Sequence, residues 1–172
     1  MRILLGDLFH TWSKGGVWTM PLNVGYVASY TKKMLKENDK VDCEINVFKD
    51  ANKIIDAIKK HKPQIVGLGF FVWNEKINKF VFDFVKENYP EILTVGGGPR
   101  FTNINANIEG AKEFFNEHPS CDVFVVNQGE KGFYKVAKTF YDKNFSTKDF
   151  KEASIPGSLV NNSDFNRINV NN

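Results

Sequence analysis

Five short apolar runs, separated by stretches of helical periodicity, restrict the possible folds of this 172-residue chain more than any other feature. Four of the runs are continuous, as in strands that are buried on both faces of a parallel sheet. They are Ile3–Leu5, Ile65–Leu68, Ile92–Val95 and Val123–Val126. In the fifth run Val41, Cys43, Ile45 and Val47 alternate with polar residues, which predicts a strand near the edge of the sheet.

Each strand-like run is followed by an amphipathic helical pattern. The patterns begin near Pro21, Asp50, Asn74, Ile104 and Phe133. Proline suits the first turn of a helix, and aspartate is a good N-cap. Because strand and helix alternate five times, we expect an α/β fold with a five-stranded parallel sheet and helices on both faces. With the alternating strand at one edge, the expected strand order is 2-1-3-4-5.

Two helical patterns carry more specific expectations. In the first helix, small residues should allow close packing on the sheet: Gly25, Ala28 and Ser29. In the third helix, an apolar stripe should face the core: Ile77, Phe80, Val81, Phe84 and Val85. After residue 143 the chain changes character and becomes rich in asparagine. We therefore expect residues 1–143 to form the α/β domain and residues 144–172 to be an extended C-terminal segment or linker.

Composition excludes several classes of protein. The formal net charge of +3 is too small to indicate a nucleic-acid-binding protein. No apolar stretch approaches the roughly 20 residues that cross a bilayer, and the N-terminal run is too short for a signal peptide. The two cysteines, Cys43 and Cys121, lie in separate strand-like runs and suggest buried thiols in a reducing compartment. These features predict a cytoplasmic protein without nucleic-acid or membrane partners.

In folds of this kind ligands bind beyond the carboxyl ends of the strands, so four loops are candidates for a site. They span residues 6–20, 69–74, 96–102 and 127–130. The third loop begins GGGPR, and glycines at a strand end either form a tight turn or let a ligand approach the backbone. We expect the second use, for Gly97 and Gly98 in particular.

Two other loops each allow two interpretations, one structural and one functional. The loop GFFVWN, at residues 69–74, has four large apolar residues that either cover the core or form the wall of a pocket for a flat, largely apolar ligand. Glu130 lies in the first turn of a helix, where a carboxylate is favourable beside the helix dipole. The glycine before it can equally leave free helix N–H groups facing the ligand edge.

Several motifs are absent from the sequence. It has no G-x-G-x-x-G after the first strand and no GxxxxGK[ST] loop, so it offers no motif for nucleotide phosphates. His61 and His118 each precede a strand, at the edge opposite to the candidate loops, and only His10 lies at the candidate edge. We therefore expect no metal site made of histidine and cysteine, and no nucleophile–base pair for catalysis.

Five segments together resemble a known family. MPLNVGYVASYTKKML, IVGLGFFVWN, PEILTVGGGPR, VFVVNQGEKGF and SIPGSLV occur in the order found in the N-terminal, cobalamin-binding-like domain of B12-type radical SAM proteins. The resemblance covers about residues 1–160. It implies a flavodoxin-like (Rossmann-like) three-layer α/β/α sandwich that holds cobalamin against the strand ends. Residues 1–143 would then be a cobalamin-binding-like domain.

The resemblance also implies the residues of a cofactor site. Phe71–Asn74 would lie beside the corrin ring, Gly97–Pro99 beside the nucleotide tail, and Gly129 and Glu130 near that tail. The loop after the first strand would complete the site. The implied cofactor-binding residues are Leu8, Phe9, Phe71, Val72, Trp73, Asn74, Gly97, Gly98, Pro99, Gly129 and Glu130.

The sequence departs from the family in two places, and it also lacks a motif of methionine-synthase-like B12 domains. The family's cluster motif CxxxCxxC is absent, so this chain is expected to hold no iron–sulfur cluster and to lack a catalytic site of its own. Gln128 replaces the glycine or acid that is usual in the family's G-E-G-E. Asp7 and His10 are one residue too far apart for the D-x-H-x-x-G of methionine-synthase-like domains, so we expect His10 not to be a cobalt ligand.

The leading hypothesis is therefore a cobalamin-binding-like module that presents B12 to a radical SAM barrel. In the family that it resembles, such modules serve most often in methyl transfer. The barrel, with its S-adenosyl-L-methionine and iron–sulfur cluster, would lie in the same longer chain or act in trans. One alternative is an interaction or regulatory domain without B12, its pocket collapsed around Phe70, Phe71 and Trp73. The other is a flavin- or nucleotide-binding protein, against which the missing phosphate loop argues.

Overall fold

The computed structural model describes residues 1–9, 20–100, 108–126 and 128–162. Its strands are β1 (Arg2–Gly6), β2 (Glu44–Phe48), β3 (Ile65–Gly69), β4 (Leu93–Gly97), β5 (Val123–Val125) and β6 (Ser158–Val160). Its helices are α1 (Leu22–Glu37), α2 (Ala51–His61), α3 (Glu75–Asn88), α4 (Ile108–Glu117), α5 (Gly129–Asp142) and α6 (Thr147–Lys151).

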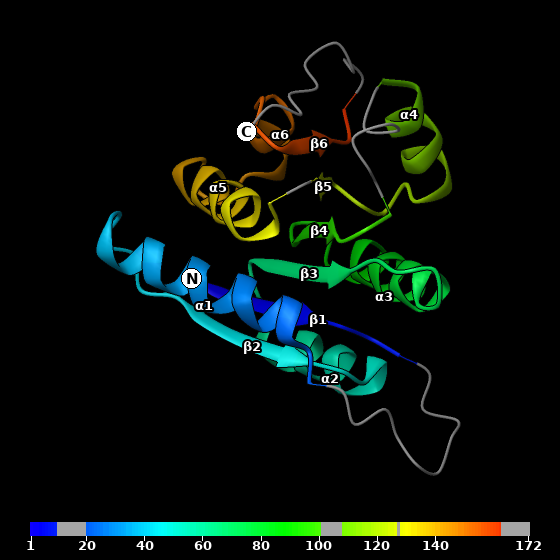
Figure 1. The fold of residues 1–172 in the computed structure, drawn as a ribbon, viewed down its shortest axis with the longest axis horizontal. Coiled ribbons are helices and arrows are strands. Elements are labelled where there is room, and N and C mark those ends of the chain that lie inside the picture. Colours follow the sequence, from blue (N-terminus) through cyan, green and yellow to red (C-terminus); the bar gives the residue numbers. More distant parts are fainter. Residues whose placement is uncertain (10–19, 101–107, 127, 163–172) are drawn as a thin grey trace.

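The six strands form one sheet in the order β2-β1-β3-β4-β5-β6 (Figure 1). The first five strands are parallel, which confirms the predicted fold class and the predicted order 2-1-3-4-5. β6 adds a sixth strand, which pairs with β5 in the antiparallel sense. β2 lies at the opposite edge, as its alternating pattern predicts, and its side chain Val47 is 38% exposed.

Helices cover both faces of the sheet (Figure 1). One core lies between the sheet and α1 and α5, and the other between the sheet and α2, α3 and α4. Leu5, Gly67, Val95 and Val123 are in register across four strands, and this row faces α1 and α5. The next row toward the carboxyl edge is Gly69, Gly97 and Val125.

Local sequence accounts for the helix ends. Asp50 caps α2, because its carboxylate accepts hydrogen bonds from the backbone N–H groups of Asn52 and Lys53 at 2.8 and 3.0 Å. α3 ends at Asn88, just before the Tyr89-Pro90 pair that predicts a stop. The expected stripe of α3 is wrong at one position, because Phe80 is 60% exposed.

Part of the segment after residue 143 is tied to the sheet. Asp122, 2% exposed, accepts hydrogen bonds from the backbone N–H and the hydroxyl of Thr94, and it pairs with Lys86 and with Lys151 of α6. Phe150 of α6 packs edge-on against the α5 ring of Phe140. The predicted division of the chain at residue 143 stays a prediction. Among the described helices, none has the length and hydropathy to cross a bilayer.

Candidate functional site

A cavity of about 210 Å³ opens at the carboxyl edge of the sheet, between the sheet and the helices α1 and α5. Strand residues form its floor, and the two helices form its walls. The lining residues are Leu5, Asn23, Val24, Val27, Gly67, Leu68, Gly69, Val95, Gly96, Gly97, Gly98, Val125, Gly129, Glu130 and Phe133. The cavity is thus lined mainly by glycines and hydrocarbon side chains, at the edge where the fold predicts a ligand.

The hollow exists because two neighbouring strand positions lack side chains. A Cβ at Gly69 would lie 3.6 Å from Phe71 Cε2, and one at Gly97 would lie 3.8 Å from Val125 Cβ. Both are ordinary contacts, so larger side chains at these positions would project into the cavity. A Cβ at Gly67 would instead lie 2.7 Å from Leu5 Cδ2 and 3.0 Å from Phe133 Cε2. The inner end of the cavity is therefore closed by packing.

Gly98 lacks a side chain for a different reason from Gly97. The expectation that the missing side chain of Gly98 serves a ligand is wrong. Its φ is +114°, a conformation that disfavours residues with a side chain. A Cβ would also lie 2.7 Å from the carbonyl oxygen of Phe70. The backbone N–H of Phe70 in turn donates to the carbonyl of Gly97 at 2.6 Å. Gly98 is required by the close approach of two loops.

The apolar loop after β3 is divided between the core and the surface. Phe70 is fully buried and packs with the rings of the α2–α4 core. Phe71 and Trp73 stack on each other, with ring centroids 4.6 Å apart and planes 10° apart. Val72 and Trp73 are 91% and 62% exposed. One residue of the loop therefore covers the core, and three form an apolar projection at the carboxyl edge.

Asn74 holds this loop in place. Its side chain is fully buried, its amide donates to the carbonyls of Leu8 and Gly69 at 3.0 and 2.9 Å, and its carbonyl accepts from the Phe71 N–H at 2.8 Å. Asn78 donates to the same Asn74 oxygen and to Gly69. Asn74 thus links the loop after β1 to the loop after β3.

The loop after β1 is described as far as Phe9. Leu8 is fully buried in the α2–α4 core, and the Phe9 ring lies under the Lys49 ammonium at 4.6 Å from its centroid. Burial raises the pKa of Asp7 above its usual range, and the charge of Lys49 partly offsets this effect. His10 lies outside the described residues.

Of the predicted site residues, Gly97, Gly98, Gly129 and Glu130 line the cavity together. Pro99 is exposed beside it. The remaining predicted residues, Leu8, Phe9, Phe71, Val72, Trp73 and Asn74, belong to the two loops described above and do not line it. Their assignment to a cofactor stays a prediction.

The contribution of α1 to the cavity was not predicted from the sequence. Val24 and Val27 line the cavity. Gly25 does not pack on the sheet, because a Cβ there would meet nothing within 4 Å, and Ser29 is exposed. Of the small residues expected on the sheet, Ala28 alone packs against the core. Small size was a misleading signal, because in this helix the valines and not the small residues face the strand ends.

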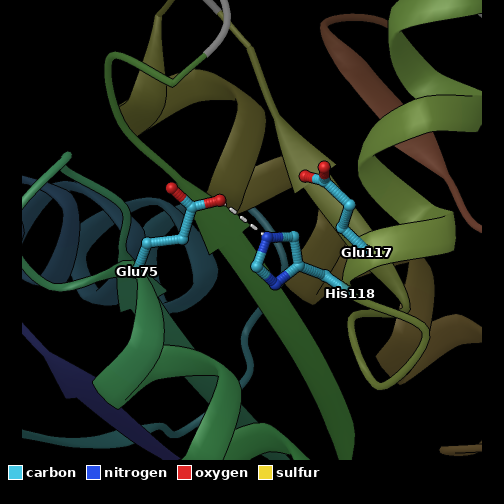
Figure 2. A group of neighbouring side chains, drawn as sticks. All are labelled: Glu75, Glu117 and His118. Carbon is cyan, nitrogen blue, oxygen red and sulfur yellow. Dashed lines mark hydrogen bonds and ion pairs between the residues drawn. The ribbon is translucent and has the colours of Figure 1, made fainter.

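A second group of polar side chains, Glu75, Glu117 and His118, lies between α3 and the end of α4 (Figure 2). His118 is buried, and its Nε2 lies 2.8 Å from Glu75 Oε1. This pairing corrects the expected place of His118, since Glu75 is the first residue of the helix that follows the carboxyl end of β3. The three side chains are close enough to share a metal ion. However, the Arg100 guanidinium lies 3.5 Å from Glu75 Oε1 and 3.6 Å from Glu117 Oε2, so the carboxylates already have a cationic partner.

Comparisons with known proteins point to one family. No family model matches the chain. The chain is 30% identical over 122 residues to the cobalamin-dependent radical SAM methyltransferase TokK of Streptomyces tokunonensis. It is 28% identical over 119 residues to the 2-(S-pantetheinyl)-carbapenam-3-carboxylate methyltransferase of Streptantibioticus cattleyicolor. These matches cover 70% and 66% of this chain but only 17% and 16% of the two methyltransferases.

Solved structures share the fold. The radical enzyme OxsB, crystallised with aqua-cobalamin and S-adenosylmethionine, matches with a TM-score of 0.61 at 17% identity, over 94% of this chain and 21% of OxsB. A cobalamin-binding protein from Desulfitobacterium hafniense matches with a TM-score of 0.52 at 15% identity, over 80% of this chain and 57% of that one. The chain is therefore related to cobalamin-dependent radical SAM methyltransferases over their N-terminal, B12-binding-like domain, and it has the flavodoxin-like fold of that domain.

Proposed function

We propose that this chain binds cobalamin and is the cofactor-binding module of a B12-type radical SAM system for methyl transfer. The observation that carries the proposal is the glycine-floored cavity between the sheet and α1 and α5, at the edge where the fold binds ligands. Its two curated relatives support the same conclusion, because both are methyltransferases and the first is named as cobalamin-dependent. The proposal includes a division of the chain into this module and a connecting segment, and it counts α6 and β6 as part of the module because they pack on its sheet.

The cavity suits the nucleotide tail of cobalamin. Gly69 and Gly97 leave room above the strand ends, and Val24 and Val27 supply an apolar wall. Gly129 and Glu130 complete the opposite wall. A flat base with a sugar attached needs such a slot, because its rings are buried by apolar contact while its polar end stays at the mouth. These residues would hold the tail.

The stacked loop after β3 suits the corrin ring. Phe71, Val72 and Trp73 form an apolar surface beside the cavity's edge, with Val72 and Trp73 well exposed. A broad apolar ring system is stabilised by burying such a surface. Asn74 and Leu8 would fix the height of this loop, and Phe9 and Pro99 would border it. When bound, cobalamin supplies a cobalt centre that can carry a methyl group.

The radical chemistry would come from another part of the protein. Its iron–sulfur cluster needs three thiolates in one motif, and this chain has two cysteines, Cys43 and Cys121, in separate strand segments. Burial raises the pKa of Cys43 to about 11 and also raises that of Cys121, so neither thiol is ionised at neutral pH. The barrel would be in the same longer chain, or it would act in trans, in the cytoplasm and without nucleic acid or membrane.

The proposal is tested by incubating the chain with hydroxocobalamin, and in parallel with FMN, followed by desalting and absorption spectroscopy. We expect a corrinoid spectrum in the protein fraction and no retained flavin. His10→Ala is expected to leave the retained spectrum unchanged. Failure to retain corrinoid at high micromolar concentration would refute the proposal, and retained FMN would favour a flavoprotein.

A second candidate is an interaction domain without B12. The exposure of Val72 and Trp73 favours it, since an apolar projection can equally contact a protein. This candidate predicts that Gly97→Val, which would fill the cavity, has no effect on partner binding. Under the main proposal the same substitution abolishes corrinoid retention.

A further inference from the structure

We propose that the cavity selects corrinoids by their tail base, and that it accepts the dimethylbenzimidazole of cobalamin in preference to adenine. This inference rests on the proposed function and specifies its ligand. The two bases share an imidazole ring and differ in the six-membered ring. In dimethylbenzimidazole this ring carries two methyl groups, whereas in adenine it contains two nitrogens and carries an amino group.

The deep part of the cavity is lined by hydrocarbon side chains that this ring can contact. Its side chains there include Val27 on the α1 wall and Val95 on β4, and Val125 follows one row nearer the carboxyl edge. Methyl groups gain free energy by contact with such a surface. A ring nitrogen or an amino group placed there loses its hydrogen bonds to water and needs a replacement from the protein.

The carbonyls of two strand-end glycines are already engaged in hydrogen bonds within the protein. The carbonyl of Gly69 already accepts from the amides of Asn74 and Asn78, at 2.9 and 3.0 Å. The carbonyl of Gly97 accepts from the N–H of Phe70 at 2.6 Å. An adenine amino group in the cavity would therefore find the Gly69 carbonyl filled and the Gly97 carbonyl already bound to one donor.

The polar side chains among the described lining residues lie at the mouth. Asn23 and Glu130 belong to the first turns of α1 and α5, which begin at the carboxyl edge. Val27 lies four residues further along α1, about 6 Å deeper at 1.5 Å per residue. Phe133 closes the inner end over Gly67. Asn23 and Glu130 are thus placed to meet the sugar of the tail and not the distal ring of its base.

The test compares three probes by equilibrium titration with the whole chain: hydroxocobalamin, the corresponding adeninylcobamide, and cobinamide, which has no tail base. We expect hydroxocobalamin to bind about tenfold tighter than adeninylcobamide or better, because each unpaired polar group in a buried site weakens binding. Equal affinities, or tighter binding of adeninylcobamide, would overturn the inference alone. Absence of binding by all three probes would overturn the proposed function and the inference with it.

A matched pair of substitutions locates the selectivity. Val27→Thr keeps the side-chain shape and adds a hydroxyl to the wall, so the ratio of the two dissociation constants should fall several-fold. Val47→Thr makes the same exchange on the exposed edge strand β2 and should leave the ratio unchanged. If Val27→Thr does not fold, Val125→Thr tests the facing wall. A ratio that stays the same in whichever cavity variant folds would overturn the assignment of selectivity to this wall.

Discussion

At the scale of single residues, two adjacent glycines at the end of β4 have opposite reasons for lacking a side chain. The Cβ position of Gly97 borders open space, whereas that of Gly98 meets the Phe70 carbonyl, and Gly98 alone of the two has a positive φ. An alanine at residue 98 would combine backbone strain with a steric clash. An alanine at residue 97 would change the cavity and leave the backbone as it is.

We therefore predict that Gly98→Ala lowers the free energy of unfolding by about 1 kcal/mol or more, and the melting temperature by roughly 2–4 °C. Gly97→Ala should leave the melting temperature of the free protein nearly unchanged and weaken corrinoid retention. Thermal melts of the free proteins and titrations with hydroxocobalamin measure the two effects. A melting temperature that falls equally in both variants would contradict this separation of roles.

The thiols provide a second prediction at this scale. Because burial raises the pKa of Cys43 to about 11 from 9.0, its thiolate fraction at pH 8 should be roughly a hundredfold lower than that of an unperturbed cysteine. Alkylation by iodoacetamide should accordingly be slow in the folded chain and accelerate as the pH approaches 11. Cys43→Ser, which leaves the fully buried Cys121, should show almost no reaction until urea is added. Fast alkylation of the folded protein at pH 8 would contradict the assigned shift.

At the scale of elements, the last helix and strand complete the sheet. β6 pairs with β5, Lys151 of α6 reaches the buried Asp122, and the Asn161 amide donates to the Cys121 carbonyl at 2.9 Å. We predict that removal of these elements destabilises the fold, as measured by urea unfolding of the whole chain and of a chain that ends at residue 143. In a chain that ends at residue 143 the free energy of unfolding should be lower by about 3 kcal/mol or more. Such a chain lacks the buried ring of Phe150, and the edge of β5 is exposed. Equal midpoints would instead favour a domain boundary at residue 143.

The elements also show what sequence patterns can specify. The parallel direction of the five strands follows from their alternation with helices, since each helix returns the chain to the same edge. Their order follows from the alternating pattern that places β2 at the edge of the sheet. β6 was not predicted, because Ser158–Val160 is too short to show a period. The loops at the carboxyl edge were located correctly, but the part played by Val27 depends on how α1 is rotated, and the part played by Gly98 depends on its φ. The hydrophobic periodicity of the sequence specifies neither the rotation of α1 nor the φ of Gly98.

At the scale of the whole molecule, the chain has a ligand cavity but not the thiolates of a radical SAM cluster. Anaerobic reconstitution with iron and sulfide should therefore leave no stoichiometric iron and no charge-transfer absorption. Added S-adenosylmethionine and reductant should yield no 5′-deoxyadenosine. Hydroxocobalamin in excess should still raise the melting temperature, since a ligand that binds only the folded state stabilises it. A stable cluster, held between two copies of the chain, would contradict this prediction.

The strand order has a consequence for synthesis on the ribosome. After β2 has paired with β1, each later strand adds at one growing edge, beside a strand that has already been made: β3 on β1, then β4, β5 and β6. A nascent chain can thus assemble its sheet vectorially, without waiting for distant sequence. The three residues of β6, the last strand in the described part of the chain, cover the edge of β5. Translation that pauses before residue 158 would leave this edge open to pairing with other chains.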